Sequence, residues 1–146
     1  MKSIFIFFSV FLTCMASEVS GQFHLGTYGF AAVGIGGPIT DRIDIEGKLF
    51  ANSTVGNLGF EFLGMYDLEP GSFHQFSVGG GFNFDLLDPG DSQVSLLLPF
   101  ELEVYPLASF RRLSLLIELA PQFYITEDQV VLRHLWGVRY YFKDPS

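Results

Sequence analysis

The stretch that decides the fold is QVVLRHLWGVRYYF, residues 129–142. Successive side chains of a β-strand point to opposite faces. One face of this stretch is mainly apolar and aromatic, and the other carries two arginines among small and polar groups. The first face comprises Leu132, His134, Trp136, Val138, Tyr140 and Phe142, and the second comprises Arg133, Leu135, Gly137, Arg139 and Tyr141. A soluble strand buries its apolar face in a core, whereas a strand of a membrane barrel turns its apolar face to lipid and its charges to the lumen.

Six further runs with strand-like alternation precede this one, and turn residues separate them. They are residues 23–36, 42–50, 58–68, 73–86, 94–105 and 113–125. The chain shows no convincing helical period, no linker and no second domain, and its 146 residues suit one domain. The pattern predicts an all-β fold: a single up-and-down antiparallel β-barrel of about eight strands, of which seven are resolved by the pattern.

The N-terminus has the features of a secretory signal peptide. Lys2 supplies a positive charge, an apolar run follows at residues 4–12, and small residues precede a cleavage point before Gln22. We therefore divide the chain into a signal peptide, residues 1–21, and a barrel domain, residues 22–146. Two alternatives stay open, a single membrane anchor and lipid attachment at Cys14, although Thr13 is a poor match to the small residue expected before a lipidated cysteine.

The composition of the mature chain excludes several classes of function. The single cysteine, Cys14, falls in the predicted signal peptide, so an exported protein would have no disulfide and would depend on backbone pairing and packing. The net charge of −8 with no basic patch argues against nucleic acid as a partner. No later stretch approaches the length of a spanning helix. Only a closed barrel could place this chain in a membrane, because lipid cannot satisfy an open sheet edge.

The charges of the alternating runs favour such a barrel with its polar face inward. We expect a paired charge network in the lumen, since buried charges are tolerated only when they are paired and hydrogen-bonded. Its candidate members are Glu61, Glu101, Glu103, Arg112, Glu118, Arg133 and Arg139. A two-residue turn at Glu127-Asp128 would set Leu116 opposite Arg139 and make Glu118 a diagonal neighbour of Arg139. We therefore expect Glu118 to lie within ion-pair distance of Arg139 or Arg133. The alternative is a solvated sheet face on which such pairs are incidental.

A second turn, at Ala108-Ser109, would set the register of the preceding pair of runs. It would place Tyr105 opposite Arg112 and Glu103 opposite Ser114, so that Glu103 and Arg112 are diagonal neighbours. Gly79 and Gly81 fall on the polar face of their run, where a narrow lumen packed with large charged groups would need room.

The C-terminal GVRYYF and the upstream RRLSLLIELAPQFYI, together with the leader and the alternating runs, resemble the small outer-membrane β-barrel proteins of gram-negative bacteria, the OmpA/OmpX-like or porin-family group. The resemblance covers most of the mature chain as a pattern, and its specific motif is the last strand. It implies that Tyr140 and Phe142 form a terminal assembly strand and that the partners are membrane lipid and the outer-membrane assembly machinery. It also implies an outer-membrane location after signal-peptide removal. Residues 143–146 extend past the terminal aromatic, which departs from the family pattern.

The strand number is a second departure, because bacterial single-chain barrels have an even number of strands. One way to reach an even number of strands is a tight hairpin at Glu46-Gly47, although Asp44, Glu46 and Lys48 would then no longer share one face of a strand. The other is that the glycine-rich run at residues 23–36 bends and counts twice. The pattern leaves both open.

Enzymatic barrels exist in the resembled group, so catalysis must be considered. His74 and His134 fall on the apolar faces of their runs, whereas Ser77, Ser114 and Glu118 fall on the polar faces. A Ser–His pair across a sheet cannot share a proton, and we expect the three histidines, His24 included, to be interfacial residues beside aromatics. Isolated histidines without cysteine also argue against a metal site. We expect no enzyme activity, no catalytic residues, no metal and no cofactor.

Two functions of different class remain. The first is a non-enzymatic integral outer-membrane barrel with a charged, side-chain-filled lumen and a structural or binding role, with no ligand identified. Eight strands enclose only enough space for side chains, so a general pore is not expected. The alternative is a secreted soluble barrel resembling a lipocalin that binds an apolar ligand. The two differ in which face of the strands is inward.

Overall fold

The structure is a computed structural model that describes residues 23–29, 31–52, 57–70, 73–85, 94–107, 109–125 and 128–143. The predicted signal peptide, its cleavage point and Cys14 lie outside these residues. Nine strand segments make up one antiparallel sheet. They are β1(His24–Tyr28), β2(Ala32–Thr40), β3(Ile43–Asn52), β4(Asn57–Pro70), β5(His74–Asp85), β6(Ser95–Leu97), β7(Phe100–Val104), β8(Leu113–Tyr124) and β9(Gln129–Tyr141).

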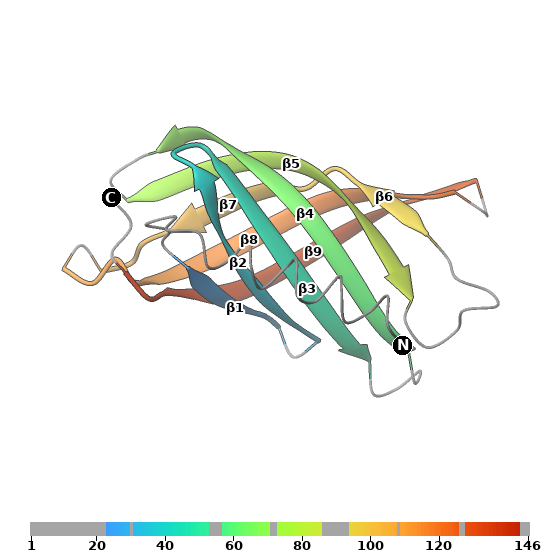
Figure 1. Ribbon diagram of the computed structural model, residues 1–146, viewed down its shortest axis with the longest axis horizontal. Helices are drawn as coiled ribbons and strands as arrows, with labels where there is room; N and C mark the ends of the chain where they lie inside the picture. Colours follow the sequence, from blue (N-terminus) through green and yellow to red (C-terminus); the bar gives the residue numbers. More distant parts are fainter. Residues whose placement is uncertain are drawn as a thin grey trace, which may run out of the picture.

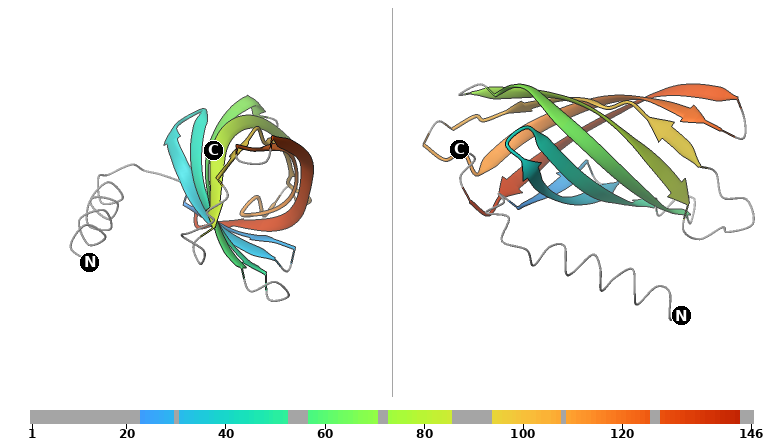
Figure 2. Two further views of the ribbon diagram at one scale, coloured as in Figure 1. Left: turned by 90° about the vertical axis from the view of Figure 1, so that its right-hand side faces the viewer. Right: turned by 45° about the horizontal axis from the view of Figure 1, so that its top comes forward.

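The sheet closes on itself because β1 pairs with β9 as well as with β2. The remaining pairings follow the order of the chain around the wall, as the labels in Figure 1 show. The left view of Figure 2 looks along the barrel and shows the ring. β6 and β7 lie one after the other between β5 and β8, so they occupy a single position in the wall. The predicted all-β, up-and-down antiparallel barrel of eight strands is confirmed.

The eighth strand comes from the glycine-rich first run. Gly29 ends β1 with a φ of +57°, a left-handed conformation that glycine adopts without steric cost, and β2 begins three residues later at Ala32. This run therefore forms two strands, as the second alternative predicted. The predicted hairpin at Glu46-Gly47 is absent, since these residues lie within β3 and pair with Leu63 and Phe62 of β4.

The boundaries of the next hairpin also differ from the sequence pattern. Gly37-Pro38 does not end the strand: β2 continues to Thr40, with a register irregularity between Pro38 and Thr40. The hairpin turn lies at Asp41 and Arg42, where the hydroxyl of Thr40 accepts a hydrogen bond from the backbone N–H of Ile43 at 3.1 Å. Proline has no N–H to donate to a ladder, and it is accommodated here beside the irregularity.

A second proline interrupts the run predicted at residues 94–105. Pro99 is buried between β6 and β7, and its carbonyl accepts a hydrogen bond from the N–H of Gly79 at 2.9 Å. The preceding N–H, of Leu98, donates to the carbonyl of Pro121 at 3.1 Å. The wall therefore remains hydrogen-bonded to both neighbours through the interruption.

Along most of their length the strands alternate between a buried and an exposed face. In β8, for example, Ser114, Leu116, Glu118 and Ala120 are buried, while Leu115, Ile117 and Leu119 are 46–55% exposed. The exposed face is apolar on every strand: it carries Val33 and Ile35 on β2, Leu102 on β7 and Trp136 on β9. Charged side chains point into the barrel and large apolar side chains cover its outside.

Two strand glycines make room inside the barrel. A Cβ built on Gly79 would meet the sulfur of Met65, and one built on Gly81 would meet the side chain of Leu63. Leu63 and Met65 are buried and pack with Leu97 and Ala120 as an apolar cluster of the interior. The inward facing of both glycines agrees with the sequence pattern, but they accommodate apolar groups rather than the large charged groups expected.

We predict that Gly81→Ala destabilises the folded barrel by about 1–3 kcal/mol, because the new methyl group meets Leu63 and the backbone of Phe62. Gly80→Ala is the matched control: its Cβ points outward and the nearest atom lies 3.9 Å away. Unfolding midpoints in detergent or lipid vesicles would measure both changes. Equal effects at the two positions would contradict the assigned facing.

Candidate functional site: the charged interior

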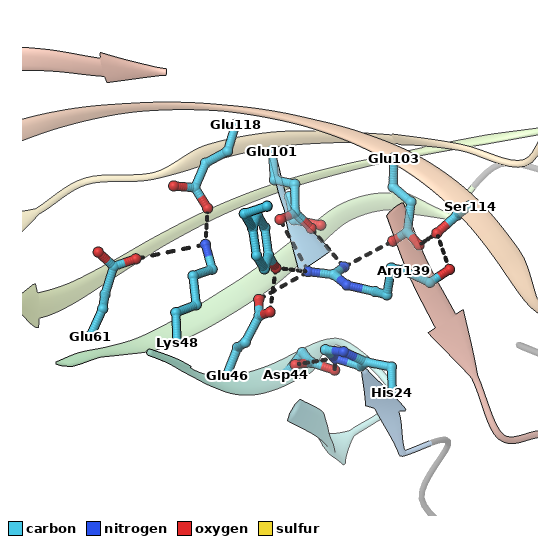
Figure 3. Close-up of polar contacts among 12 residues, drawn as sticks. His24, Asp44, Glu46, Lys48, Glu61, Glu101, Glu103, Ser114, Glu118 and Arg139 are labelled. Carbon is cyan, nitrogen blue, oxygen red and sulfur yellow. Dashed lines mark hydrogen bonds and ion pairs between the residues drawn. The ribbon is translucent and has the colours of Figure 1, made fainter. Parts of the chain in front are cut away.

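The buried polar side chains of the barrel gather in its interior. β3, β4, β7, β8 and β9 each bring charged groups there because every second residue of a strand points inward. Figure 3 shows these side chains converging from opposite parts of the wall. They form two clusters of ion pairs, which we name after their arginines.

The Arg139 cluster contains three carboxylates around one guanidinium. One terminal nitrogen of Arg139, Nη1, donates to Glu101 Oε1 at 2.7 Å and to Glu103 Oε2 at 3.1 Å. The other, Nη2, donates to Glu46 Oε2 at 2.9 Å and to Glu101 Oε2 and the hydroxyl of Tyr28 at 3.1 Å each. All five side chains are at most 6% exposed. Arg139 thus joins β1, β3 and β7 to β9 through the interior.

Hydroxyl groups complete the Arg139 cluster. Tyr28 donates to Glu46, and Ser114 donates to Glu103. The hydroxyl of Tyr141 donates to Glu103 Oε2 at 2.9 Å. These neutral donors satisfy carboxylate lone pairs that would otherwise be buried without partners.

The Arg133 cluster is balanced, with two cations and two carboxylates. Lys48 Nζ forms an ion pair with Glu118 and lies 3.6 Å from Glu61 Oε1. Arg133 bonds both carboxylates: its Nη2 lies 2.6 Å from Glu118 Oε1 and 3.0 Å from Glu61 Oε1. Lys48, Glu61 and Glu118 are fully buried, and the side chain of Arg133 is 16% exposed. Lys48 also lies 4.2 Å from the ring centroid of Tyr28, which links the two clusters.

The histidine expectation was wrong for His24. This residue is fully buried inside the barrel, where its Nε2 lies 3.2 Å from Asp44 Oδ1. His74 and His134 are exposed on the outer face, as their parity indicated. Within the described part of the chain, Ser77 donates to Asp67 at 2.7 Å, and no group of three or more His, Cys, Asp or Glu residues could hold a metal ion.

The predicted register of β8 and β9 was wrong by two residues. Tyr124, not Thr126, pairs with Gln129, and Asp128 has a φ of +48°. Ser114, not Leu116, lies opposite Arg139. Because the shift is even, every side chain keeps its predicted face. Glu118 consequently reaches Arg133 instead of Arg139.

The register between β7 and β8 differs in the same way. Glu103 pairs with Leu116 rather than Ser114, because the connection spans residues 105–112 instead of turning tightly at Ala108-Ser109. The Ser114 side chain nonetheless bonds Glu103 from the adjacent inward position. Arg112 lies half-buried at the start of β8, where its carbonyl accepts a hydrogen bond from Tyr141 N at 2.8 Å.

Six residues predicted for the lumen network lie in the two clusters. Glu61, Glu118 and Arg133 belong to the Arg133 cluster, and Glu101, Glu103 and Arg139 belong to the Arg139 cluster. Tyr28, Glu46 and Lys48 also belong to the clusters, although their places there were not predicted. The alternation of Asp44, Glu46 and Lys48 was a usable signal for the last two, whereas Tyr28 lay in a run whose facing the glycines obscured.

The candidate terminal strand ends with both aromatic side chains outside the barrel. Tyr140 and Phe142 are 37% and 51% exposed, and their ring centroids are 5.5 Å apart. Phe142 also lies 5.3 Å from the ring of Phe23, next to the start of β1. The contact joins the two ends of the closed wall. Their role as an assembly signal remains a prediction.

We predict energetic coupling between Glu118 and Arg133. Glu118→Gln and Arg133→Gln should each destabilise the barrel, and the double change should cost less than the sum by about 0.5–3 kcal/mol. The cycle of Glu118→Gln with Arg139→Gln is the control, because Glu118 bonds Lys48 and Arg133 while Arg139 bonds the other cluster. Chemical unfolding in detergent would measure both cycles, and stronger coupling to Arg139 would contradict the register.

Comparisons of the chain with protein-family models, with curated proteins and with solved structures found no match. Among the described residues, no helix is long and apolar enough to cross a membrane. The class of the protein must therefore be argued from the barrel itself.

Proposed function

We propose that the protein is a non-enzymatic integral outer-membrane β-barrel with a structural or binding role. The observation that carries the proposal is the polarity of the wall. Large apolar side chains are exposed on every strand, while the paired charges lie inside. In water an exposed apolar face of this extent is unfavourable, because monomeric soluble proteins rarely expose contiguous apolar patches of more than a few hundred Å². In a bilayer the same face contacts hydrocarbon.

Closure and strand length support the same function. A closed barrel pairs its backbone groups around the ring, which hydrocarbon requires because it offers no hydrogen bonds. β4, β5, β8 and β9 contain 12–14 residues, more than the roughly 9–11 residues that a tilted strand needs to cross a bilayer. The partners that follow are membrane lipid and the outer-membrane assembly machinery, and the location is the outer membrane after signal-peptide removal.

The filled interior favours a structural or binding role over transport. Ion pairs connect strands from opposite parts of the wall through the middle of the barrel, as Arg139 of β9 does with Glu46 of β3. His74 and His134 are also poorly placed for a Ser–His hydrolase, because they lie on the outer face while Ser77 and Ser114 point inward. A lipocalin-like binder would instead require an apolar inward face.

Membrane fractionation of the full chain, expressed at a low level in a gram-negative host, tests the proposal. We expect the protein in the outer-membrane fraction after alkaline carbonate extraction, with a gel mobility that changes on heating. The heat-dependent mobility distinguishes a folded barrel from aggregates that sediment with membranes. Recovery of folded protein from the periplasm or the medium would support the soluble alternative and overturn the proposal.

A further inference from the structure

The Arg139 cluster contains more negative groups than its single cation can balance. Glu46, Glu101 and Glu103 all bond Arg139, whereas the Arg133 cluster has one cation for each carboxylate. The three glutamates are at most 3% exposed. A buried ion without a counter-ion is strongly unfavourable, and a carboxylate in such a position takes up a proton instead.

The hydrogen bonds of Arg139 show the same imbalance. Its Nη2 carries two hydrogens, and three oxygens lie within 3.1 Å of it, those of Tyr28, Glu46 and Glu101. Its Nη1 uses its two hydrogens on Glu101 and Glu103. One oxygen near Nη2 therefore lacks a hydrogen of its own. A proton on the Glu101 carboxyl would remove one acceptor and one negative charge together.

Glu101 is the member best suited to be neutral. Glu103 accepts hydrogen bonds from Arg139, Tyr141 and Ser114, and Glu46 accepts them from Arg139 and Tyr28. Glu101 accepts two hydrogen bonds, both from Arg139, whose charge it shares with the other two carboxyl groups. A hydroxyl donor favours the ionised form of the carboxyl group that it bonds, and the hydroxyls of Tyr28, Ser114 and Tyr141 bond Glu46 and Glu103 rather than Glu101.

The charged neighbours of Glu101 point the same way. Glu118 of β8 is its register partner, Glu103 follows two residues later on the same face of β7, and Glu46 of β3 shares Arg139 with it. The remaining groups that face it are the phenol of Tyr28 on β1, Lys48 on β3, the hydroxyl of Ser77 on β5 and Arg139 on β9. Lys48 forms its ion pairs with Glu118 and Glu61, and its charge also acts on Glu46 and Glu101.

We propose that Glu101 holds a proton at neutral pH, so that the Arg139 cluster is a proton-binding site in the interior of the folded barrel. The three carboxyl groups share Arg139, and the proton resides on Glu101. The inference depends on the interior alone, and it holds whether the outer face contacts lipid or another environment.

Infrared spectroscopy of the full chain folded in detergent micelles tests the proposal directly. At neutral pH we expect a C=O stretching band of a protonated carboxylic acid, separate from the bands of carboxylates. Glu101→Gln should remove this band, because the amide replaces the acid. Glu61→Gln is the matched control: Glu61 is equally buried but belongs to the balanced cluster, so the band should remain.

Thermal unfolding of the same variants provides a second readout. Glutamine has the shape and neutrality of a protonated glutamate, so Glu101→Gln should change the unfolding temperature at neutral pH by less than about 3 °C, whereas Glu61→Gln should lower it by roughly 10 °C. The folded wild type would bind a proton that the unfolded chain releases. Its stability should therefore fall as the pH is raised through neutral, and Glu101→Gln should lack this component.

Three outcomes would overturn the proposal. The first is the absence of a carboxylic acid band in the folded wild type at neutral pH. The second is persistence of the band in Glu101→Gln, which would place the proton on another group. The third is a loss of stability in Glu101→Gln as large as in Glu61→Gln, including failure to fold, since that would show a required negative charge at Glu101.

Discussion

Arg139→Met is expected to lower the free energy of unfolding of the barrel by about 3–5 kcal/mol or to prevent its folding. Arg139 is the cation that Glu46, Glu101 and Glu103 share in the Arg139 cluster. Its loss leaves these buried carboxyl groups close together without the counter-ion that they share. It also removes the group that ties β9 to β1, β3 and β7. Folding yield and chemical unfolding in detergent would measure the effect.

Two further variants make this prediction specific. Arg139→Lys keeps the charge but offers one donor group in place of two, so it cannot bond all three carboxylates in the same geometry and should give an intermediate loss. Arg42→Met removes an exposed arginine of the β2–β3 turn and should be nearly neutral. If Arg139→Met were as well tolerated as Arg42→Met, the cluster would not be a stabilising feature of the fold.

Ile117→Arg is expected to have the second large effect, and its size depends on the proposed membrane location. Ile117 points outward from the middle of β8 and pairs with Leu102 and Trp136 on the neighbouring strands. An arginine on the lipid face costs about 2–4 kcal/mol at the bilayer midplane and about 0–1 kcal/mol near the interfaces. The substitution should therefore reduce insertion into lipid vesicles and lower the stability of the inserted barrel.

Ile125→Arg is the matched control. Ile125 is as exposed as Ile117 and follows the end of the same strand, so the new charge would lie near the edge of the apolar belt. A large cost at Ile117 with a small cost at Ile125 would support lipid contact. Similar and small costs at both positions would favour a barrel surrounded by water, since surface substitutions there change stability by only about 0.5 kcal/mol.

Part of the interior could be predicted from the sequence because it depends on parity. Leu115, Ile117 and Leu119 had to share a face opposite Ser114 and Glu118 once the segment was a strand. The faces of the glycine-rich segment, residues 23–36, could not be predicted from alternation in this way. Gly34 and Gly36 carry no side chain to show polarity. The division into β1 and β2 therefore stayed one of two open alternatives, and the inward position of Tyr28 could not be recognised.

The sequence by itself determined the class of fold, the alternation along each strand and the set of charges on one face, because these follow from the two-residue period of the backbone. Only the tertiary structure decided which charges meet. A shift of two residues leaves every face unchanged, so the pattern could not distinguish Arg133 from Arg139 as the partner of Glu118. The contacts of Arg139 join residues 36 to 111 positions apart, and closure of the barrel brings them together.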